Sequence, residues 1–181
     1  MKTYLLLFLS LFLSELCFRQ QTNLSSFIPA GWSILDTAKG DLNQDGIKDY
    51  IMILKNNKEA DDDTSTMARP LLILQGQKGG KLILIAKNDH VVLCYHCGGV
   101  FGDPYDGIVV KNSFFSIQHY GGASEKWTRI ITFKYDPKTK TYVLHKDGGD
   151  SFSPFEPEKK ESFFYNKEHW DKMKFIDYIS D

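Results

Sequence analysis

The chain has 181 residues, a length that suits one domain able to bury its own hydrophobic core. Its 22 Lys and Arg nearly balance its 23 Asp and Glu, so the formal net charge is -1. This balance argues against general nucleic-acid binding, which favours a strongly basic surface. Apolar residues make up 42% of the chain and charged residues 25%, which excludes wholesale disorder. The aromatic share of 14% favours β structure.

The first 21 residues have the features of an export signal. Lys2 precedes an apolar stretch, residues 4–14, which is too short to span a membrane as a helix but fits the core of a signal peptide. Cys17 would be the site of a lipid anchor, but the three residues before it match a lipoprotein signal poorly. We therefore expect residues 22–181 to form a single exported β domain. Without a later apolar stretch of spanning length, the protein is expected in the periplasm, at the cell surface or outside the cell.

Turn residues divide the rest of the chain into short segments with strand composition. These segments are residues 50–54, 71–75, 81–86, 91–93, 108–110, 114–120, 127–135 and 141–145. Their spacing predicts an all-β fold, an antiparallel meander of hairpins, for which sandwich, barrel and propeller are the candidate architectures.

The apolar pattern also predicts which strand faces are covered. In residues 81–86 apolar side chains occupy both faces, so both faces are expected to be covered, as in stacked sheets. In residues 114–120 apolar and polar side chains alternate, which predicts one wetter face.

Two further elements are expected near the C-terminus. The Pro-rich and charged residues 154–161 indicate a loop. Asn166 is a suitable cap for a short helix that carries Trp170, Met173 and Ile176 at helical spacing.

The strongest motif is an acidic loop at residues 41–49. Counted from Asp41, oxygen-bearing side chains occur at positions three, five and nine, and glycine occurs at position six, as in a calcium loop. The expected calcium ligands are the side chains of Asp41, Asn43, Asp45 and Asp49 and the carbonyl group of Ile47. In an EF-hand, position twelve is Glu and a helix follows, whereas here that position is Met52 within an apolar run. We therefore expect a structural Ca²⁺ site that leads into a strand, and Mg²⁺ is a poorer fit for such a loop.

Cys94 and Cys97 form a C-x-x-C sequence and are the only cysteines after the signal peptide. In an oxidising compartment the simplest expectation is a disulfide between them. A redox role is disfavoured because strand residues precede the motif, where thioredoxin-type motifs begin a helix. A zinc site would need two more ligands, and the nearby His90 and His96 match no zinc-ligand spacing.

The chain carries none of the catalytic or nucleotide-binding signatures that sequence alone reveals. The nucleophile-elbow motif G-x-S-x-G, the P-loop and the dinucleotide fingerprint are all absent. His119 and His145 fall in expected strands, where packing or surface roles are the simpler interpretation. We therefore do not expect an enzyme.

Residues 41–49, which precede a strand, resemble the calcium loops of FG-GAP and VCBS-type repeats in β-propeller proteins. A wider resemblance covers nearly the whole chain after the signal peptide. It is carried by residues 69–72 (RPLL), 88–94 (NDHVVLC), 97–104 (CGGVFGDP), 119–122 (HYGG), 127–129 (WTR) and 145–149 (HKDGG). These motifs resemble a family of small bacterial envelope proteins. The resemblance implies a propeller-like fold, bound calcium and, as in at least one relative, a periplasmic immunity protein that inhibits a lysozyme-like peptidoglycan hydrolase.

Three functions remain open on the sequence. An inhibitor of a cell-wall hydrolase would insert a rigid loop into a cleft, and residues 98–107 offer Phe101 and Tyr105 as anchors and Asp103 as a polar contact. The same aromatics would also suit a tight connection that caps the core. A carbohydrate-binding or adhesion module would use Trp32 and Trp127 to stack on sugars. A secreted enzyme without a known signature is the third.

Overall fold

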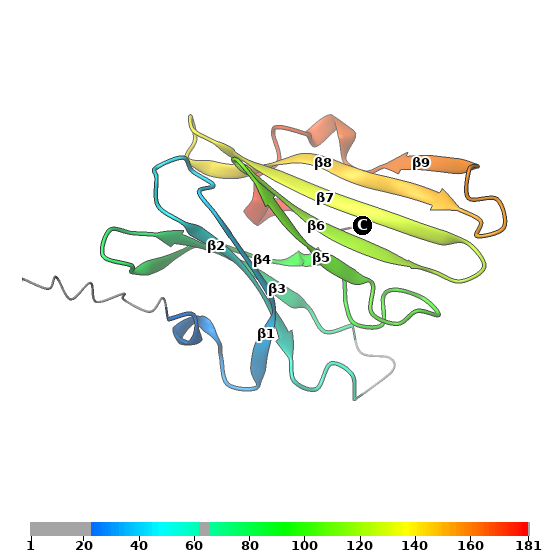
Figure 1. The fold of residues 1–181 in the computed structure, drawn as a ribbon, viewed down its shortest axis with the longest axis horizontal. Coiled ribbons are helices and arrows are strands. Elements are labelled where there is room, and N and C mark those ends of the chain that lie inside the picture. Colours follow the sequence, from blue (N-terminus) through cyan, green and yellow to red (C-terminus); the bar gives the residue numbers. More distant parts are fainter. Residues whose placement is uncertain (1–22, 62–65, 181) are drawn as a thin grey trace, which may run out of the picture.

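The computed structural model describes residues 23–61 and 66–180, which form two antiparallel sheets (Figure 1). The predicted signal peptide, with Cys17, lies outside the described residues. One sheet contains β1 (Trp32–Gly40), β2 (Asp49–Asn56), β3 (Arg69–Gly76) and β4 (Leu82–Val92). The other contains β5 (Tyr105–Lys111), β6 (Phe114–Gly122), β7 (Lys126–Asp136), β8 (Thr141–Phe152) and β9 (Lys160–Phe164). Neighbours within each sheet follow chain order, so both are simple meanders.

The main core lies between the two sheets. Ile51 and Ile73 from the four-stranded sheet and Phe115 and Ile131 from the five-stranded sheet belong to one buried cluster. The sheets meet closely at β1 and β5, where a Cβ on Gly40 would collide with Val110. Glycine at this position therefore allows the two edges to approach.

The C-terminal segment fills the space between β4 and β8. It contains two short 3-10 helices, η2 (Lys167–His169) and η3 (Phe175–Asp177), of which η3 lies against β4 and β8. Phe175 and Tyr178 are buried in the main core. Asn88 Nδ2 donates hydrogen bonds to the carbonyl groups of Phe175 (2.7 Å) and Tyr178 (2.8 Å), which fixes this segment to β4.

A second cluster covers the outer face of the four-stranded sheet. Met52 and Leu72 are buried there beneath the N-terminal segment, which includes η1 (Ser25–Phe27). Trp32 packs against this cluster and is half-buried, so it is part of the fold's packing.

The sequence predicted the antiparallel all-β fold correctly, and most expected strands are present. Residues 81–86 and 91–93 belong to one strand, β4, rather than two. The sequence missed β1 and β9, which are edge strands of their sheets, and β9 begins inside the expected loop 154–161. The described residues show two meanders and no closed barrel or propeller ring.

Two more detailed expectations were wrong. In place of one C-terminal helix from Asn166 there are two 3-10 turns, and Asn166 itself has a φ of 51° and makes no side-chain cap. The C-terminal segment that follows Asn166 instead runs between the two sheets, where Phe175 is buried. The outer part of β4 is not covered on both faces, since Ile83, Leu84 and Ile85 are exposed. The alternation at β6 was confirmed, with Phe115 and Ile117 buried.

Candidate functional site

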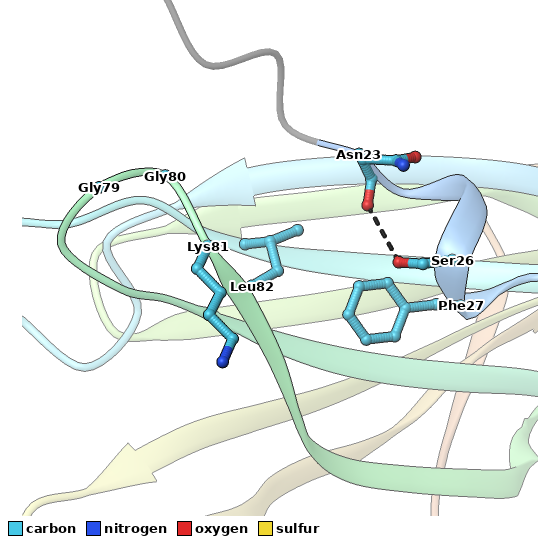
Figure 2. A pocket seen from close by; sticks show the side chains of 7 residues that line it. All are labelled: Asn23, Ser26, Phe27, Gly79, Gly80, Lys81 and Leu82. Atoms are coloured by element: carbon cyan, nitrogen blue, oxygen red, sulfur yellow. Dashed lines mark hydrogen bonds between the residues drawn. The ribbon is translucent and has the colours of Figure 1, made fainter.

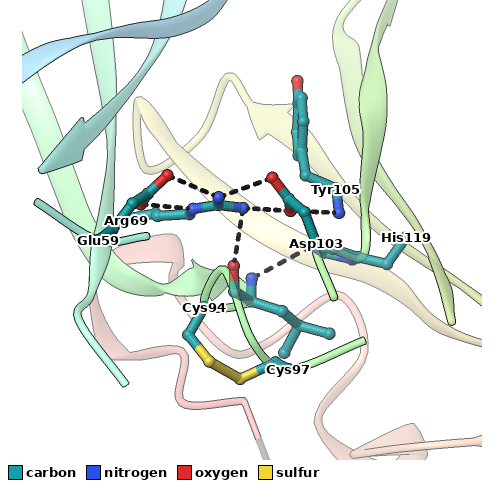
Figure 3. The surroundings of a disulfide bond; sticks show 8 residues. Glu59, Arg69, Cys94, Cys97, Asp103, Tyr105 and His119 are labelled. Carbon is teal, nitrogen blue, oxygen red and sulfur yellow. Dashed lines mark hydrogen bonds and ion pairs between the residues drawn. A yellow bond between two sulfur atoms is a disulfide. The ribbon is translucent and has the colours of Figure 1, made fainter. Parts of the chain in front are cut away.

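The segment between β4 and β5 is held in place by the buried guanidinium group of Arg69. Arg69 of β3 is fully buried and donates to both oxygens of Glu59 at 2.9 and 2.8 Å. It also donates to both oxygens of Asp103 at 2.6 and 2.8 Å (Figure 3). One guanidinium therefore joins two carboxylates in a geometry that only Arg can provide.

The disulfide lies beside this group, as Figure 3 shows. Cys94 and Cys97 are bonded, which confirms the expected pair. Arg69 Nη1 also lies 3.4 Å from the carbonyl oxygen of Leu93, directly before the disulfide. The start of the segment is thus fixed by a covalent bond and by a hydrogen bond to the same arginine.

The next residues form a tight loop, residues 98–102, tied to β6. Gly98 N–H donates to the carbonyl of Gly102 (2.8 Å), and Gly122 N–H donates to the carbonyl of Gly98 (2.9 Å). Gly99 and Gly102 have φ values of 71° and 72°, which side-chain-bearing residues adopt at a cost. These residues let the chain turn back on itself within five positions.

The tip of the 98–102 loop is apolar and exposed. Val100 is 82% exposed and Phe101 is 50% exposed. The ring of Phe101 lies 5.8 Å from that of Tyr120, and Lys126 Nζ lies 3.8 Å from the Phe101 centroid. These contacts hold the ring in place while half of the Phe101 surface stays exposed.

The structure places the three sequence-predicted contact residues differently. Phe101 is at the loop tip. Asp103 is engaged by Arg69, and its side chain is 31% exposed. Tyr105 is half-buried, and its hydroxyl donates to Asp36 of β1 at 2.8 Å. Asp103 and Tyr105 therefore anchor the base of the loop.

Sequence reasoning missed Arg69, Glu59 and Asp36 as part of this site. Arg69 stands at the start of an otherwise apolar run and was noted only within a motif. A charge in such a run signals a buried pair, because an unpaired buried charge is costly. The sequence does not identify the partners, which are 10 and 34 residues away.

His119 lies under the same segment and is 1% exposed. Its Nε2 accepts the N–H of Leu93 at 3.2 Å, so the ring is neutral with its proton on Nδ1. Burial, and then the positive charges of Arg129 and Arg69, lower the pKa of His119 to about 3. The residue therefore supports the segment before the disulfide as a neutral hydrogen-bond acceptor.

In the acidic loop, residues 41–49, side-chain oxygens accept hydrogen bonds from backbone N–H groups of the same loop. Asp41 accepts the N–H groups of Asp45 (3.0 Å) and Gly46 (2.9 Å), and Asp45 accepts the N–H of Ile47 (2.8 Å). Asn43 Oδ1 also accepts the Asp45 N–H at 3.0 Å. Gly46 has a φ of 85°, which fits the sharp turn assigned to it.

Asp49 has a structural role at the end of this loop. It is fully buried and accepts N–H groups from Leu42 (3.0 Å), Asn43 (3.4 Å) and Gly76 (3.0 Å). Burial raises the pKa of the Asp49 carboxyl, against the lowering effect of these hydrogen bonds. Asp49 thus joins the loop to the end of β3.

The fit of a cation to this loop is mixed. Within residues 23–61 and 66–180, no three Asp, Glu, His or Cys side chains gather closely enough to hold a metal ion. A carboxylate oxygen that accepts one N–H keeps a further lone pair, so Asp41 and Asp45 retain capacity for a hard cation. The buried hydroxyl of Tyr142 lies in the field of Asp49, Asp45 and Asp41 and has no hydrogen-bond partner among the described residues. The donor chemistry therefore suits calcium, while the carboxylates are directed at the backbone.

An aromatic cleft adjoins the disulfide on the inner face of the five-stranded sheet. It has a volume of about 470 Å³ and is lined by Leu93, Cys97, Trp127, Arg129, Ser151, Phe163 and Tyr165. The Arg129 guanidinium lies 4.1 Å from the Tyr165 centroid and is paired with Asp147 at 2.8 Å. Gly121 makes room for Trp127, since a Cβ there would collide with the indole.

A further hollow of about 490 Å³ lies between η1 and the turn from β3 to β4 (Figure 2). Phe27 and Leu82 form its apolar side, and Ser26 Oγ donates to the Asn23 carbonyl at its rim (3.3 Å). The hollow holds one cationic side chain, Lys81, and offers no convergent set of polar groups. We therefore do not assign it a function.

Comparisons of the chain with protein-family models, curated proteins and solved structures gave no match. No helix within residues 23–61 and 66–180 is long and apolar enough to cross a membrane.

Proposed function

We propose that this chain is an exported binding protein that inserts the 98–102 loop into a cleft of a protein partner. The observation that carries the proposal is the exposed apolar tip, Val100 and Phe101, on a base held by a disulfide and a buried arginine. A loop that is already ordered loses little conformational entropy on binding. An aromatic tip supplies the kind of anchor that dominates binding energy at protein interfaces.

The proposed partner is a secreted peptidoglycan hydrolase, and the chain would act as its inhibitor or immunity protein. Support for this class comes from the resemblance of the motifs at residues 97–104, 119–122 and 145–149 to a family of small bacterial envelope proteins, of which at least one relative is an immunity protein. These motifs include the 98–102 loop and the glycines at the end of β6, to which the loop is hydrogen-bonded. A disulfide is typical of proteins that fold in an oxidising compartment, which supports export.

The test is a lysis assay with co-encoded or endogenous muramidases, together with a direct binding measurement. Phe101→Ala should weaken partner binding by about 2 kcal/mol, or roughly 30-fold. Phe155→Ala is the matched control, because Phe155 is 91% exposed on a different loop. Equal effects of the two substitutions, or no inhibition of any muramidase, would contradict the proposal.

We also propose a structural calcium ion at the acidic loop, as in the propeller-like calcium-loop proteins that it resembles. Asp41, Asn43 and Asp45 would supply oxygen ligands, together with the carbonyl of Ile47 and the carboxylate of Asp49. The ion would offset the repulsion between three neighbouring carboxylates.

Carbohydrate binding is the second candidate function, and the cleft at Trp127 favours it. Its aromatic rings, with Ser151 and Arg129 as polar groups, suit the apolar face and hydroxyls of a sugar. Trp32, which packs against the fold, would not take part. Glycan-array binding that Trp127→Ala abolishes and Phe155→Ala preserves would support this function, and an array without binding would exclude it.

A further inference from the structure

The two cysteines of the disulfide differ in their access to solvent. Cys94, which follows β4, is only 8% exposed, whereas Cys97 is an exposed residue. Cys97 also lines the aromatic cleft of about 470 Å³, and Cys94 is not among the residues that line it. A molecule that enters this cleft therefore reaches the sulfur of Cys97 and not that of Cys94.

A thiol can open this bond at little cost to the fold. Thiol–disulfide exchange depends on access to one sulfur, and exposed disulfides are the labile ones. The two cysteines are three positions apart, so the bond closes a very small ring and adds little to the free energy of unfolding. Arg69 holds Leu93 and Asp103, on either side of the motif, through hydrogen bonds that do not involve sulfur. The segment therefore stays in place when the bond opens.

The cleft beside the disulfide has room for an apolar group next to an incoming thiol. Trp127 and Tyr165 supply aromatic faces to it. Gly149 of β8 stands opposite both Arg129 and Phe163, which line the cleft, so the sheet places no side chain between them. An open, mostly aromatic cleft favours a thiol with aromatic neighbours over a small polar thiol.

We propose that Cys97 is a thiol–disulfide exchange site for a cysteine thiol carried by an aromatic peptide segment. The peptide thiolate attacks Sγ of Cys97, and the new sulfur–sulfur bond forms as the bond between Cys94 and Cys97 breaks. The electron pair of the broken bond leaves with Cys94, which takes up a proton in place of the one lost by the peptide thiol. The product is one mixed disulfide and one free thiol, so the step needs no further oxidant or reductant.

This exchange differs from that of thioredoxin-type motifs. Those motifs begin a helix, which lowers the pKa of a cysteine, whereas Cys94 follows a strand and residues 95–98 form a turn. Selectivity here comes from the burial of one sulfur and the exposure of the other. The chain accepts one thiol per disulfide and is therefore not required to act as an enzyme. The exchange also does not depend on the partner proposed for the 98–102 loop.

Single-cysteine variants of the full-length chain test which sulfur is accessible. Both carry Cys17→Ser, so that each keeps one thiol. Cys94→Ser leaves Cys97, which iodoacetamide should alkylate at least about ten times faster than the buried Cys94 left in Cys97→Ser. In concentrated urea the two rates should become equal, because the difference arises from the fold. Equal rates in the folded proteins, or faster alkylation of Cys94, would overturn the proposal.

The intact disulfide provides a second test, which does not rely on the folding of single-cysteine variants. The Cys17→Ser protein is mixed with an excess of a tripeptide in which cysteine lies between two phenylalanines, and in parallel with glutathione. After an acid quench, mass spectrometry should find the tripeptide on Cys97 and a free thiol at Cys94. A mixed disulfide on Cys94, or none at all, would overturn the proposal.

The rates with the two thiols test the cleft. The aromatic tripeptide should react severalfold faster than glutathione at equal thiolate concentration. Trp127→Ala should remove this preference, and Phe155→Ala should retain it, because Phe155 is 91% exposed on a different loop. Equal rates with both thiols, or the same preference in both variants, would overturn the assignment of the cleft to an aromatic peptide.

Discussion

Arg69 of β3 and Asp103, which precedes β5, are joined by two hydrogen bonds across 34 positions of the chain. The same guanidinium binds Glu59, so it links the four-stranded sheet to the segment that carries the exposed tip. Tyr105 extends the connection to Asp36 of β1. The geometry of the 98–102 loop therefore depends on charged side chains from β1 and β3 and from the segments after β2 and before β5.

Loss of Arg69 should be strongly destabilising. Arg69→Met leaves the buried carboxylate of Glu59 without its partner, and we expect a loss of about 3 kcal/mol in the free energy of unfolding. Urea unfolding measures this change, and adding Glu59→Gln should recover part of it. Lys159→Met is the control, because Lys159 and Glu156 form an exposed pair whose loss should cost well under about 1 kcal/mol. Similar losses in both single variants would contradict the role of Arg69.

Calcium removal should lower the melting temperature of the wild-type protein. Chelation removes an ion that binds the folded chain in preference to the unfolded one, so the folded state loses that stabilisation. In Asp45→Ala the melting temperature should no longer respond to chelation, whereas in Asp106→Ala the response should be retained, since Asp106 is an exposed residue of β5. A wild-type melt that is unchanged by EDTA and by added calcium would remove the ion from the proposal.

Acid should weaken the fold through His119. The pKa of His119 is about 3 in the folded protein and about 6.5 in the unfolded chain, so between these values the unfolded chain binds the extra proton. The contribution of neutral His119 to the free energy of unfolding is therefore fully present above pH 6.5, the pKa of the unfolded chain, and falls as the pH drops below that value. We expect a loss of about 1.4 kcal/mol between about pH 7.5 and about pH 5.5.

The matched variant is His119→Gln, whose neutral side chain can still accept the N–H of Leu93. The free energy of unfolding of this variant should be lower than that of the wild type at both pH values. It should also change less between them. Denaturant unfolding at both values provides the comparison. If the free energy of unfolding fell by the same amount in wild type and variant between these pH values, the acid sensitivity would have to come from other groups.

Removal of the disulfide should affect the loop more than the fold. Cys94 and Cys97 are three positions apart, so the bond closes a very small ring and its stabilisation is about 2 kcal/mol or less. The double replacement by Ser should therefore fold, because Arg69 and Asp103 still hold the segment. Chemical unfolding measures the stability of the double variant, and partner binding measures the effect on the 98–102 loop. We expect the loss of binding free energy to be larger than the loss of stability. Complete unfolding of the double variant would show that the bond carries far more of the fold.

The sequence by itself determined the all-β meander, most of its strands and the Cys94–Cys97 bond. These features follow from local information, namely alternation, turn residues and the only two cysteines after Cys17. It also identified the acidic loop at residues 41–49, although its cation remains a prediction. The sequence did not predict β1 and β9, because no residue of either strand is fully buried and neither carries a clear apolar pattern.

Only the tertiary structure decided which charges meet, which surfaces stay exposed and how the C-terminal segment runs. Arg69 finds Glu59 and Asp103 because the two sheets bring distant positions together, and no local pattern records such a pairing. The helix expected from Asn166 gives way to turns because Phe175 and Tyr178 fill the gap between the sheets. The apolar run of β4 shows the same limit, because its composition predicts cover on both faces, whereas Ile83, Leu84 and Ile85 are exposed among the described residues.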